Sequence, residues 1–588
     1  MKKIVRVLLI LIAFCLIFAA CGKTTAPSEA PDDRVSIDDK NNGGEESQDT
    51  EGDDEIVNPV GVFPIVKEGH DVTITAFAAL TSRVDDFENN EFTKWLTEKT
   101  NVKLKFVSAP STDSKTKLNL LLNSGDYPDV IWGHLSAPEM ALYGSQGVLI
   151  PLDEYIEKYS YYVHKVFEEY PAAKDVITST DGKIYALPDI NDCYHCKFGS
   201  GRIWVYMPFV KKLNLSIPNT TEEFYQVLKA IKEGDPNENG KPDEIPYASE
   251  HINYMRGYFM NSFMTYTNEN VWIDDNGKVR ACYTEEEYKE GLRYLRRLYA
   301  EGLILKETFV ISNDELITIG ENPEAPLIFS ATAWGPEGVV KKAGPSGRWF
   351  EYLTIPPLEG PSGIRYARYT GQYNAVSPRY FITDKCQYPE VAVRLGDFLY
   401  DTEATIRAYI GPEGVSWEWS EEGTKGIHGE QALYRELVAY GTQEMNVSWD
   451  QMNHSFRSSH FRLSNEAAGA DEVMEYLNTR NPDIAQKMND YPAYNEIMKY
   501  YEMKINYEPY AYDEKHILPP LIYEDKKYEE MADLKAVIEP YVDEMFARFI
   551  TGDADIDADW NKYIEELKQM GLDRMLEIMQ EAYEDKYK

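Results

Sequence analysis

Three short stretches of the chain carry the polar and apolar pattern of β-strands. Residues 72–77 and 102–107 alternate between apolar and polar positions, and residues 129–132 form a brief apolar run after a turn. Helical patterns separate them, one through Phe92 and Leu96 and another over residues 117–122. Strands that alternate with helices indicate βαβ units and a largely parallel sheet. The predicted fold class is therefore α/β.

Helical periodicity returns later in the chain. Residues 285–300 and 389–400 are predicted helices, and from residue 533 to the end the pattern is almost wholly helical. Leaving out the polar N-terminal part, about 520 residues remain, which is more than one hydrophobic core usually serves. We therefore expect two lobes.

The N-terminus has the organisation of an export signal. Positive residues at 2, 3 and 6 precede an apolar run at 8–18, and small residues then lead to Cys21. This resembles a bacterial lipoprotein signal, although Phe18 stands where that family usually has Leu. The resemblance implies a signal peptide at 1–20 and an acylated Cys21 that anchors the chain to the outer face of the membrane. An ordinary secretory signal and a single membrane span are the alternatives, but a span needs roughly 20 apolar residues.

Residues 21–68 are predicted to be an acidic, disordered tether. From residue 22 to residue 58 the composition is polar and acidic, so this part cannot bury enough apolar surface to order itself. The whole chain carries a formal net charge of −39. Nucleic acid and anionic lipid surfaces would be repelled, and we expect neither as a partner.

Cysteine is sparse for an exported protein. After Cys21 the chain has Cys193, Cys196, Cys282 and Cys386, which is too few for a disulfide framework. Cys193 and Cys196 flank a histidine, but a closed zinc site needs four ligands, and no second cluster with matching spacing is present. A local or mixed disulfide and free thiols both remain open.

Four segments together carry a family resemblance. Residues 91–96, 121–130 and 181–188 are similar to the extracellular solute-binding proteins of ABC importers. Residues 548–572 resemble the end of the carbohydrate-associated branch of these lipoproteins. Residues 206–208 depart from the pattern, because relatives often carry Arg or Lys and then Asp there.

The resemblance implies a two-lobed clamshell of the type II periplasmic-binding-protein kind. The first α/β lobe would comprise residues 69–188 and 373–430, and the second α/β lobe residues 189–372. Residues 431–588 would form a mainly helical C-terminal region that packs on the lobes. The implied protein is a monomer without enzymatic activity that captures a carbohydrate, of which an oligosaccharide is expected, and delivers it to an ABC permease.

An acidic loop in the second lobe matches the first nine positions of an EF-hand-type calcium loop. Oxygen side chains alternate, a glycine follows the third of them, and a backbone carbonyl and two acids complete the set. Pro246 stands where the bidentate glutamate is expected, so Glu244 would replace it. Similar loops in the resembled branch bind structural calcium, whereas the alternative is a solvated Asx-turn loop. The predicted Ca²⁺ ligands are Asp235, Asn237, Asn239, Lys241, Asp243 and Glu244.

Sugar sites combine aromatic platforms with carboxylates, amides and arginines that bridge hydroxyl pairs. Candidates of these types lie at an expected strand end, before a Gly-Pro turn and near the expected crossings between the lobes. A tryptophan is also a common core residue, so we expect about half of the set to line the cleft. The candidates are Trp132, Asp189, Arg202, Trp204, Trp334 and Tyr373.

Two other functions are compatible with an anchored chain. A surface glycan-active enzyme would need two carboxylates about 5 to 10 Å apart, and the 99 acidic residues of the chain leave this alternative open. Zinc-protease, nucleophile-elbow, phosphate-loop and dinucleotide motifs are absent from the sequence. A lipoprotein that captures a ligand for a membrane sensor is the other alternative.

Overall fold

A computed structural model describes residues 56–588 of the protein, apart from positions 268–269, 343, 372, 441–443, 453, 480–483, 485–486 and 489. The predicted signal peptide, Cys21 and the tether up to residue 55 lie outside the described residues. The folded part begins before the predicted tether boundary at residue 68. Ile65 and Val66 are fully buried, and Val57 pairs with Val66. Burial of these apolar side chains against the first lobe extends that lobe toward the N-terminus.

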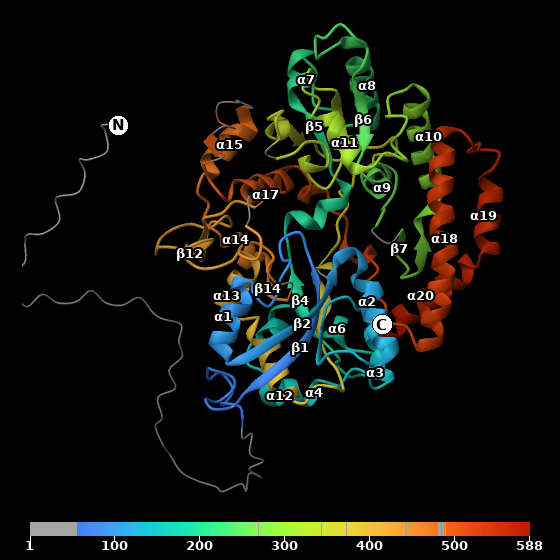
Figure 1. Cartoon of the computed structure of the whole chain (residues 1–588). Helices are drawn as coiled ribbons and strands as arrows, with labels where there is room; N and C mark the ends of the chain where they lie inside the picture. Colours follow the sequence, from blue (N-terminus) through green and yellow to red (C-terminus); the bar gives the residue numbers. More distant parts are fainter. Residues whose placement is uncertain are drawn as a thin grey trace, which may run out of the picture. The chain divides into compact units, whose positions relative to one another are not determined.

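The first lobe is built on a six-stranded mixed sheet (Figure 1). The strand order is β14-β4-β11-β3-β1-β2; β1 is parallel to β2 and β3, whereas β11 is antiparallel to β3 and β4. The two strands predicted from alternation are confirmed as β1 and β2, and the strand predicted from the apolar run at 129–132 is confirmed as β3. The bounds are β1 Val72–Leu80, β2 Val102–Pro110, β3 Val130–Trp132, β4 Leu187–Asn191, β11 Val376–Ile382 and β14 Phe456–Arg457.

Helices cover this sheet and bury one face each against it. The first begins where the side chain of Asn90 accepts a hydrogen bond from the N–H of Thr93, and it ends at Asn101 in the left-handed conformation. It buries Phe92 and Leu96 in the core. The helices of this lobe are α1 Glu91–Thr100, α2 Ser111–Ser124, α3 Ala137–Ser145, α4 Asp153–Tyr159, α5 Val163–Glu169, α6 Pro171–Ile177, α12 Pro389–Phe398 and α13 Thr402–Tyr409.

The second lobe has its own four-stranded sheet in the order β10-β5-β9-β6. β6 is parallel to β9, and β5 is antiparallel to both β9 and β10. Its strands are β5 Ile203–Tyr206, β6 Ile245–Ser249, β9 Ile328–Thr332 and β10 Tyr352–Thr354, and a separate hairpin has β7 Val271–Ile273 and β8 Val279–Ala281. Its helices are α7 Met207–Lys212, α8 Thr221–Gly234, α9 Ile252–Phe259, α10 Glu286–Ala300 and α11 Asn313–Gly320.

The C-terminal region is helical, as predicted, and α18 runs along α10 (Figure 1). Phe546 and Phe549 of α18 share one hydrophobic core with Leu292 and Leu295 of α10. The described α-helices between residues 470 and 587 all contribute side chains to this core and therefore complete the second lobe instead of forming a separate body. Apart from β14 and short 3₁₀ helices, the described elements after α13 are β12 Trp417–Trp419, β13 Tyr434–Glu436, α14 Ser459–Leu463, α15 Ala470–Thr479, α17 Tyr494–Asn506, α18 Asp525–Thr551, α19 Trp560–Gln569 and α20 Leu572–Tyr587.

Short 3₁₀ helices occupy several connections. They are η1 His195–Gly201, η2 Met260–Ser262, η3 Cys282–Thr284, η4 Pro336–Gly338, η5 Arg348–Glu351, η6 Tyr373–Ala375, η7 Glu508–Tyr510 and η8 Glu514–His516. Of these, η1 matters most for the site, because it lies between β4 of the first sheet and β5 of the second.

Within the described residues, the chain passes between the two lobes three times. Residues 192–202 lead from β4 to β5, and residues 355–375 lead back from β10 to β11. The third passage was not predicted: β14 pairs with β4 in the first sheet, and α17 then joins the core of the second lobe. The predicted end of the first lobe at residue 430 is therefore too early. β14 is two residues long, which is too short for periodicity to reveal.

Candidate functional site

The acidic loop follows α8 and is wrapped around its own side-chain oxygens. Asp235 opens it with a φ of 43°, in the left-handed region. Its carboxylate accepts hydrogen bonds from the N–H groups of Asn239 and Gly240, at 3.2 and 3.1 Å. The side-chain oxygens of Asn237 and Asn239 accept from the N–H groups of Asn239 and Lys241, at 3.0 and 2.8 Å. These Asx-turns hold the alternating oxygens of the loop in a compact arrangement.

Two acids complete the loop. Asp243 accepts hydrogen bonds from the amide nitrogens of Asn237 and Asn239, at 3.1 and 3.0 Å. Glu244 is 8% exposed, and its Oε2 is buried without a hydrogen-bond partner. Burial, and then the negative charge of Asp235 and Asp243, raises the pKa of Glu244. A buried, unpartnered carboxylate oxygen beside two other carboxylates fits the needs of a hard divalent cation.

The two candidates of the first lobe lie in its interior. Trp132 is buried at the end of β3, with its ring edge-to-face against Tyr380 and His454 at centroid distances of 5.2 and 6.4 Å. Asp189 is buried in β4 and accepts a hydrogen bond from Arg457 at 3.0 Å. Both side chains are engaged by contacts within the lobe.

Arg202, Trp204 and Trp334 lie together beside η1. Trp204 is 0% exposed, and its indole N–H donates to the carbonyl of Ala333 at 3.0 Å. Arg202 is also fully buried; its guanidinium donates to the carbonyl of Trp334 and lies 5.3 Å from the centre of that ring. Trp334 is 38% exposed. Of these three candidates, Trp334 alone presents an aromatic surface to solvent.

The indole of Trp334 is held in place by η1 and by a hydrogen bond from its own backbone N–H. It packs so closely on η1 that a Cβ added to Gly199 would come within 2.1 Å of the ring. The backbone N–H of Trp334 donates to Glu250 at 2.9 Å, and burial raises the pKa of that carboxyl. An exposed ring, a buried guanidinium and a carboxyl thus lie at the passage between the lobes.

The last candidate, Tyr373, lies in η6 on the return passage. Its ring packs edge-to-face against Tyr587 of α20 with centroids 5.7 Å apart. It is partly buried in the first-lobe core. Tyr373 therefore links that lobe to the C-terminal helix.

Sequence reasoning missed a polar connection between the lobes. The guanidinium of Arg83, just after β1, donates hydrogen bonds to the carboxylate of Asp450 at 2.6 Å and to the hydroxyl of Tyr440. Lys342 of the second lobe donates to the carbonyl of Tyr440 at 2.7 Å. Tyr440 thus contacts residues of both lobes. The sequence indicated this connection only through the position of Arg83 after a predicted strand. Lys342, Tyr440 and Asp450 lie hundreds of positions later in the chain.

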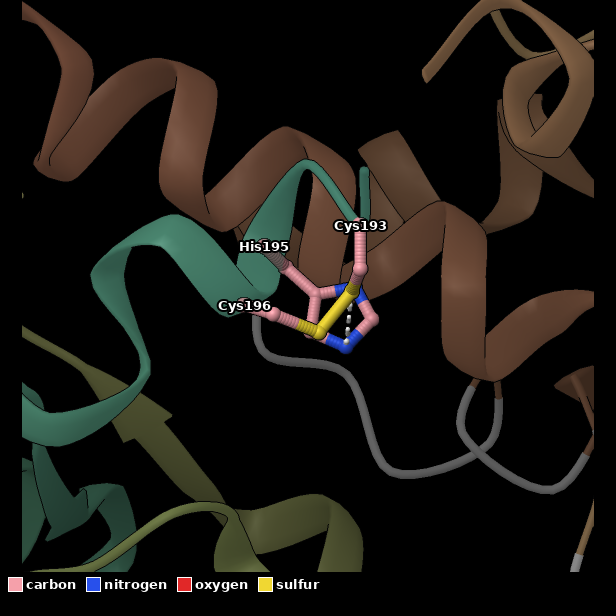
Figure 2. A group of neighbouring side chains, drawn as sticks. All are labelled: Cys193, His195 and Cys196. Atoms are coloured by element: carbon pink, nitrogen blue, oxygen red, sulfur yellow. Dashed lines mark hydrogen bonds between the residues drawn. A yellow bond between two sulfur atoms is a disulfide. The ribbon is translucent and has the colours of Figure 1, made fainter. Parts of the chain in front are cut away.

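Cys193 and Cys196 form a disulfide within and beside η1, and the imidazole of His195 lies against it (Figure 2). These three side chains are close enough to share a metal ion, but their sulfurs are bonded to each other. Of the options left open by the sequence, the local disulfide is the one observed. Cys282 and Cys386 are free thiols.

Comparison with known proteins adds a relative that spans most of the chain. The fructooligosaccharide ABC transporter substrate-binding protein FusA of Streptococcus pneumoniae serotype 4 (strain ATCC BAA-334 / TIGR4) is 27% identical over 488 residues. The match covers 80% of this chain and 83% of the relative.

Two solved structures of FusA share the fold. FusA in complex with kestose has a TM-score of 0.69 at 24% identity, and the match covers 87% of this chain and 99% of that one. An EF-hand mutant of FusA in complex with fructo-nystose has a TM-score of 0.69 at 23% identity, with the same coverage. The family model for bacterial extracellular solute-binding proteins matches residues 73–406, more than half of the chain. With two lobes joined by three passages and a family match across both, this chain belongs to the bacterial extracellular solute-binding proteins.

Proposed function

We propose that this solute-binding protein captures an oligosaccharide between its two lobes and delivers it to an ABC permease, acting as a monomer and not as an enzyme. The observation that carries the proposal is the exposed indole of Trp334 at the passage between the lobes, beside Arg202 and Glu250. The 27% identity to a fructooligosaccharide-binding protein over 80% of the chain supports the ligand class.

The flat C–H face of a sugar ring packs well on an indole, while hydroxyl groups need charged or polar partners. Trp334 provides the first kind of contact. Glu250, which accepts from the backbone N–H of Trp334, is a candidate for the second kind, and the buried guanidinium of Arg202 holds the Trp334 segment in place through its carbonyl. Ligand contacts to both lobes would stabilise the closed state, which a permease would recognise. Trp132, Asp189, Trp204 and Tyr373 are proposed to support this site through packing, since their side chains are engaged elsewhere.

The acidic loop is proposed to bind one structural Ca²⁺ ion. The ion would be held by the side chains of Asp235, Asn237, Asn239, Asp243 and Glu244 and by the carbonyl of Lys241. It would provide a positive counter-charge for the buried carboxylate of Glu244, whose Oε2 has no hydrogen-bond partner. The EF-hand mutant of FusA points to a comparable loop in a relative. Ion binding would fasten the end of α8 to the start of β6.

We also propose that Cys21 carries acyl chains that hold the protein at the extracellular face of the cell membrane. The signal-like residues 1–20 and the polar residues 22–58 support this arrangement. None of the helices in the described part of the chain is long and apolar enough to cross a membrane. Detergent-phase partitioning of the expressed protein tests the anchor: partitioning should be lost in Cys21→Ser.

The proposed function is tested by titrating the chain from residue 22 onward with kestose, longer fructooligosaccharides, unrelated oligosaccharides, peptides and amino acids. Binding of one saccharide class with one-to-one stoichiometry and no released products is expected, together with a higher melting temperature. Steady product release would favour the enzyme alternative, and binding of peptides alone would overturn the proposal. Loss of saccharide uptake on deletion of the partner permease would separate import from sensing.

A further inference from the structure

The disulfide beside η1 is asymmetric in its surroundings. Cys193 is 4% exposed, whereas Cys196 is partly exposed. The imidazole of His195 lies against Cys193, with Nε2 at 3.5 Å and Nδ1 at 3.6 Å from its Sγ (Figure 2). An incoming thiol would therefore reach the sulfur of Cys196, and the sulfur of Cys193 would be the leaving group beside the histidine.

His195 has a second partner. Its Nδ1 lies 3.4 Å from the carboxylate Oε2 of Glu496 in α17. With the Nδ1 proton directed at that carboxylate, Nε2 is free to accept a proton from a thiol on Cys193. A cysteine is activated when a base lies beside its thiol and a carboxylate orients that base. Cys193, His195 and Glu496 have this arrangement. Burial, followed by the charges of Lys499, Arg202 and Arg462, lowers the pKa of His195 well below its usual value. The ring is therefore neutral at pH 7 but a weaker base than a free imidazole, and the carboxylate of Glu496 at 3.4 Å counters this by favouring the protonated ring.

The two other cysteines lack this environment. Burial raises the pKa of the Cys282 thiol to about 12 and that of Cys386 to about 12. Their thiolates are scarce at neutral pH, and the thiolate is the reactive form. Replacing both with alanine therefore removes no reactive thiol from the chain.

We propose that Cys193, His195 and Cys196, with Glu496, form a thiol–disulfide exchange site whose substrates are dithiols and low-molecular-weight disulfides. In the reductive direction, one thiolate of a dithiol attacks Sγ of Cys196 and breaks the bond to Cys193, which leaves as a thiolate and takes a proton. The second thiol of the reductant then attacks the reductant sulfur that is bonded to Cys196. This closes the disulfide of the reductant and releases Cys196, which also takes a proton. The dithiol loses two electrons and two protons, and the cysteine pair gains them.

In the oxidative direction, the thiolate of Cys196 attacks a small disulfide such as oxidised glutathione, forms a mixed disulfide and releases one thiolate. His195 then takes the proton of Cys193, whose thiolate attacks Sγ of Cys196 and expels the second glutathione. The role assigned to His195 belongs to this second step, in which Cys193 must be deprotonated. Its loss should therefore make the mixed disulfide on Cys196 accumulate.

The experiment uses the chain from residue 22 onward with Cys282→Ala and Cys386→Ala, so that two cysteines remain. This double variant, the parent for the test, is reduced with dithiothreitol in its folded state and reoxidised with oxidised glutathione. Samples are quenched with acid, and their masses are measured by mass spectrometry. We expect rapid return of the disulfide in this parent. In His195→Gln we expect resolution at least about tenfold slower, with accumulation of the glutathione adduct.

Single-cysteine variants test the assigned roles. Cys193→Ser should leave a Cys196 thiol that takes up glutathione at least about tenfold faster than the Cys193 thiol of Cys196→Ser, because access controls the rate. Melting curves show whether each variant is folded. Equal rates in the two variants, resistance of the native disulfide to millimolar dithiothreitol, or unchanged or faster resolution in folded His195→Gln would each overturn the proposal. The last result would mean that His195 only covers the disulfide.

Discussion

The guanidinium of Arg457 and the carboxylate of Asp189 form an ion pair in the interior of the first lobe, with Nη2 3.0 Å from Oδ2. The side chains are 5% and 4% exposed. Arg457 lies in β14 and Asp189 in β4, so the pair fastens a late segment of the chain to the first sheet. An aspartate expected to bind ligand is thus the partner of an arginine that follows it by 268 residues.

Breaking this pair should destabilise the protein strongly. Arg457→Met leaves the carboxylate of Asp189 buried without its counter-charge, which costs about 3 to 5 kcal/mol of unfolding free energy. Urea unfolding measures the change. Lys94→Met, which removes an exposed pair with Glu91, should have little effect. Equal effects of the two substitutions would contradict the structural role of the buried pair.

The two tryptophans beside η1 should behave differently. Trp204→Ala empties a fully buried site and should cost about 3 to 5 kcal/mol of stability. Trp334→Ala removes a partly exposed ring, so we expect a small stability change and a loss of saccharide affinity of at least about tenfold, which is about 1.4 kcal/mol. Calorimetric titration and thermal melting distinguish the effects. Unchanged affinity in Trp334→Ala would remove this residue from the site.

The close packing of Trp334 on Gly199 predicts a second effect on ligand affinity. In Gly199→Ala the new methyl group would overlap the indole and displace it, and affinity should fall while the ring itself is still present. A double variant with Trp334→Ala should bind no more weakly than Trp334→Ala alone, since both changes act on the same ring. Fully additive losses would mean that Gly199 acts elsewhere.

Calcium should stabilise the protein through the acidic loop. Adding Ca²⁺ to protein treated with a chelator should raise the melting temperature, because an ion that binds the folded state alone stabilises it. Glu244→Gln should abolish most of the increase. Glu238→Gln is a matched control, since this loop residue pairs with Lys212 at 2.8 Å and is not a predicted ligand. A Ca²⁺ response that survives Glu244→Gln would place the ion elsewhere.

Glu436 should make stability depend on pH. Burial, and then the negative charge of Glu496, raises the pKa of the Glu436 carboxyl from 4.5 to about 8, although the positive charges of Lys342 and Arg462 act to lower it. Between these values the folded protein holds a proton that the unfolded chain has lost, so stability falls as the pH rises from 4.5 to 8. The lowered pKa of Lys342, about 8 against 10.5, acts above this window.

Glu436→Gln should remove that decline. Urea unfolding should show the variant close to its parent at pH 5 and more stable than its parent at pH 8. Glu418→Gln on neighbouring β12, where the carboxylate pairs with Arg435 at the surface, serves as the control and should show no such difference. A Glu436→Gln effect of the same size at both pH values would contradict the raised pKa.

Features encoded within a few neighbouring residues could be predicted. The alternation at 72–77 and 102–107 predicted β1 and β2, because the pleat places successive side chains on opposite faces. The oxygen spacing of the acidic loop likewise placed Asn237, Asn239 and Asp243 in mutual hydrogen-bonding contact. The role of Glu244 as a replacement ligand stays a prediction, and its buried, unpartnered oxygen is a structural feature that the sequence did not reveal.

Exposure and partnership could not be predicted in this way. Trp204 and Trp334 look alike in sequence, yet the first is 0% exposed in the second-lobe core and the second is 38% exposed, because burial depends on which distant segments pack around each ring. The same holds for the third passage between the lobes, which rests on the two residues of β14.

Local periodicity predicts the α/β class from the amino-acid sequence alone, short motifs carry the family resemblance that the family match confirms, and the oxygen spacing of one loop predicts calcium ligands. The tertiary structure decides that Asp189 meets Arg457, that Tyr440 contacts both lobes and that Cys193 bonds Cys196 beside His195. The physical reason is range: backbone preference acts over a few residues, whereas burial, charge pairing and access are set by contacts between segments hundreds of residues apart.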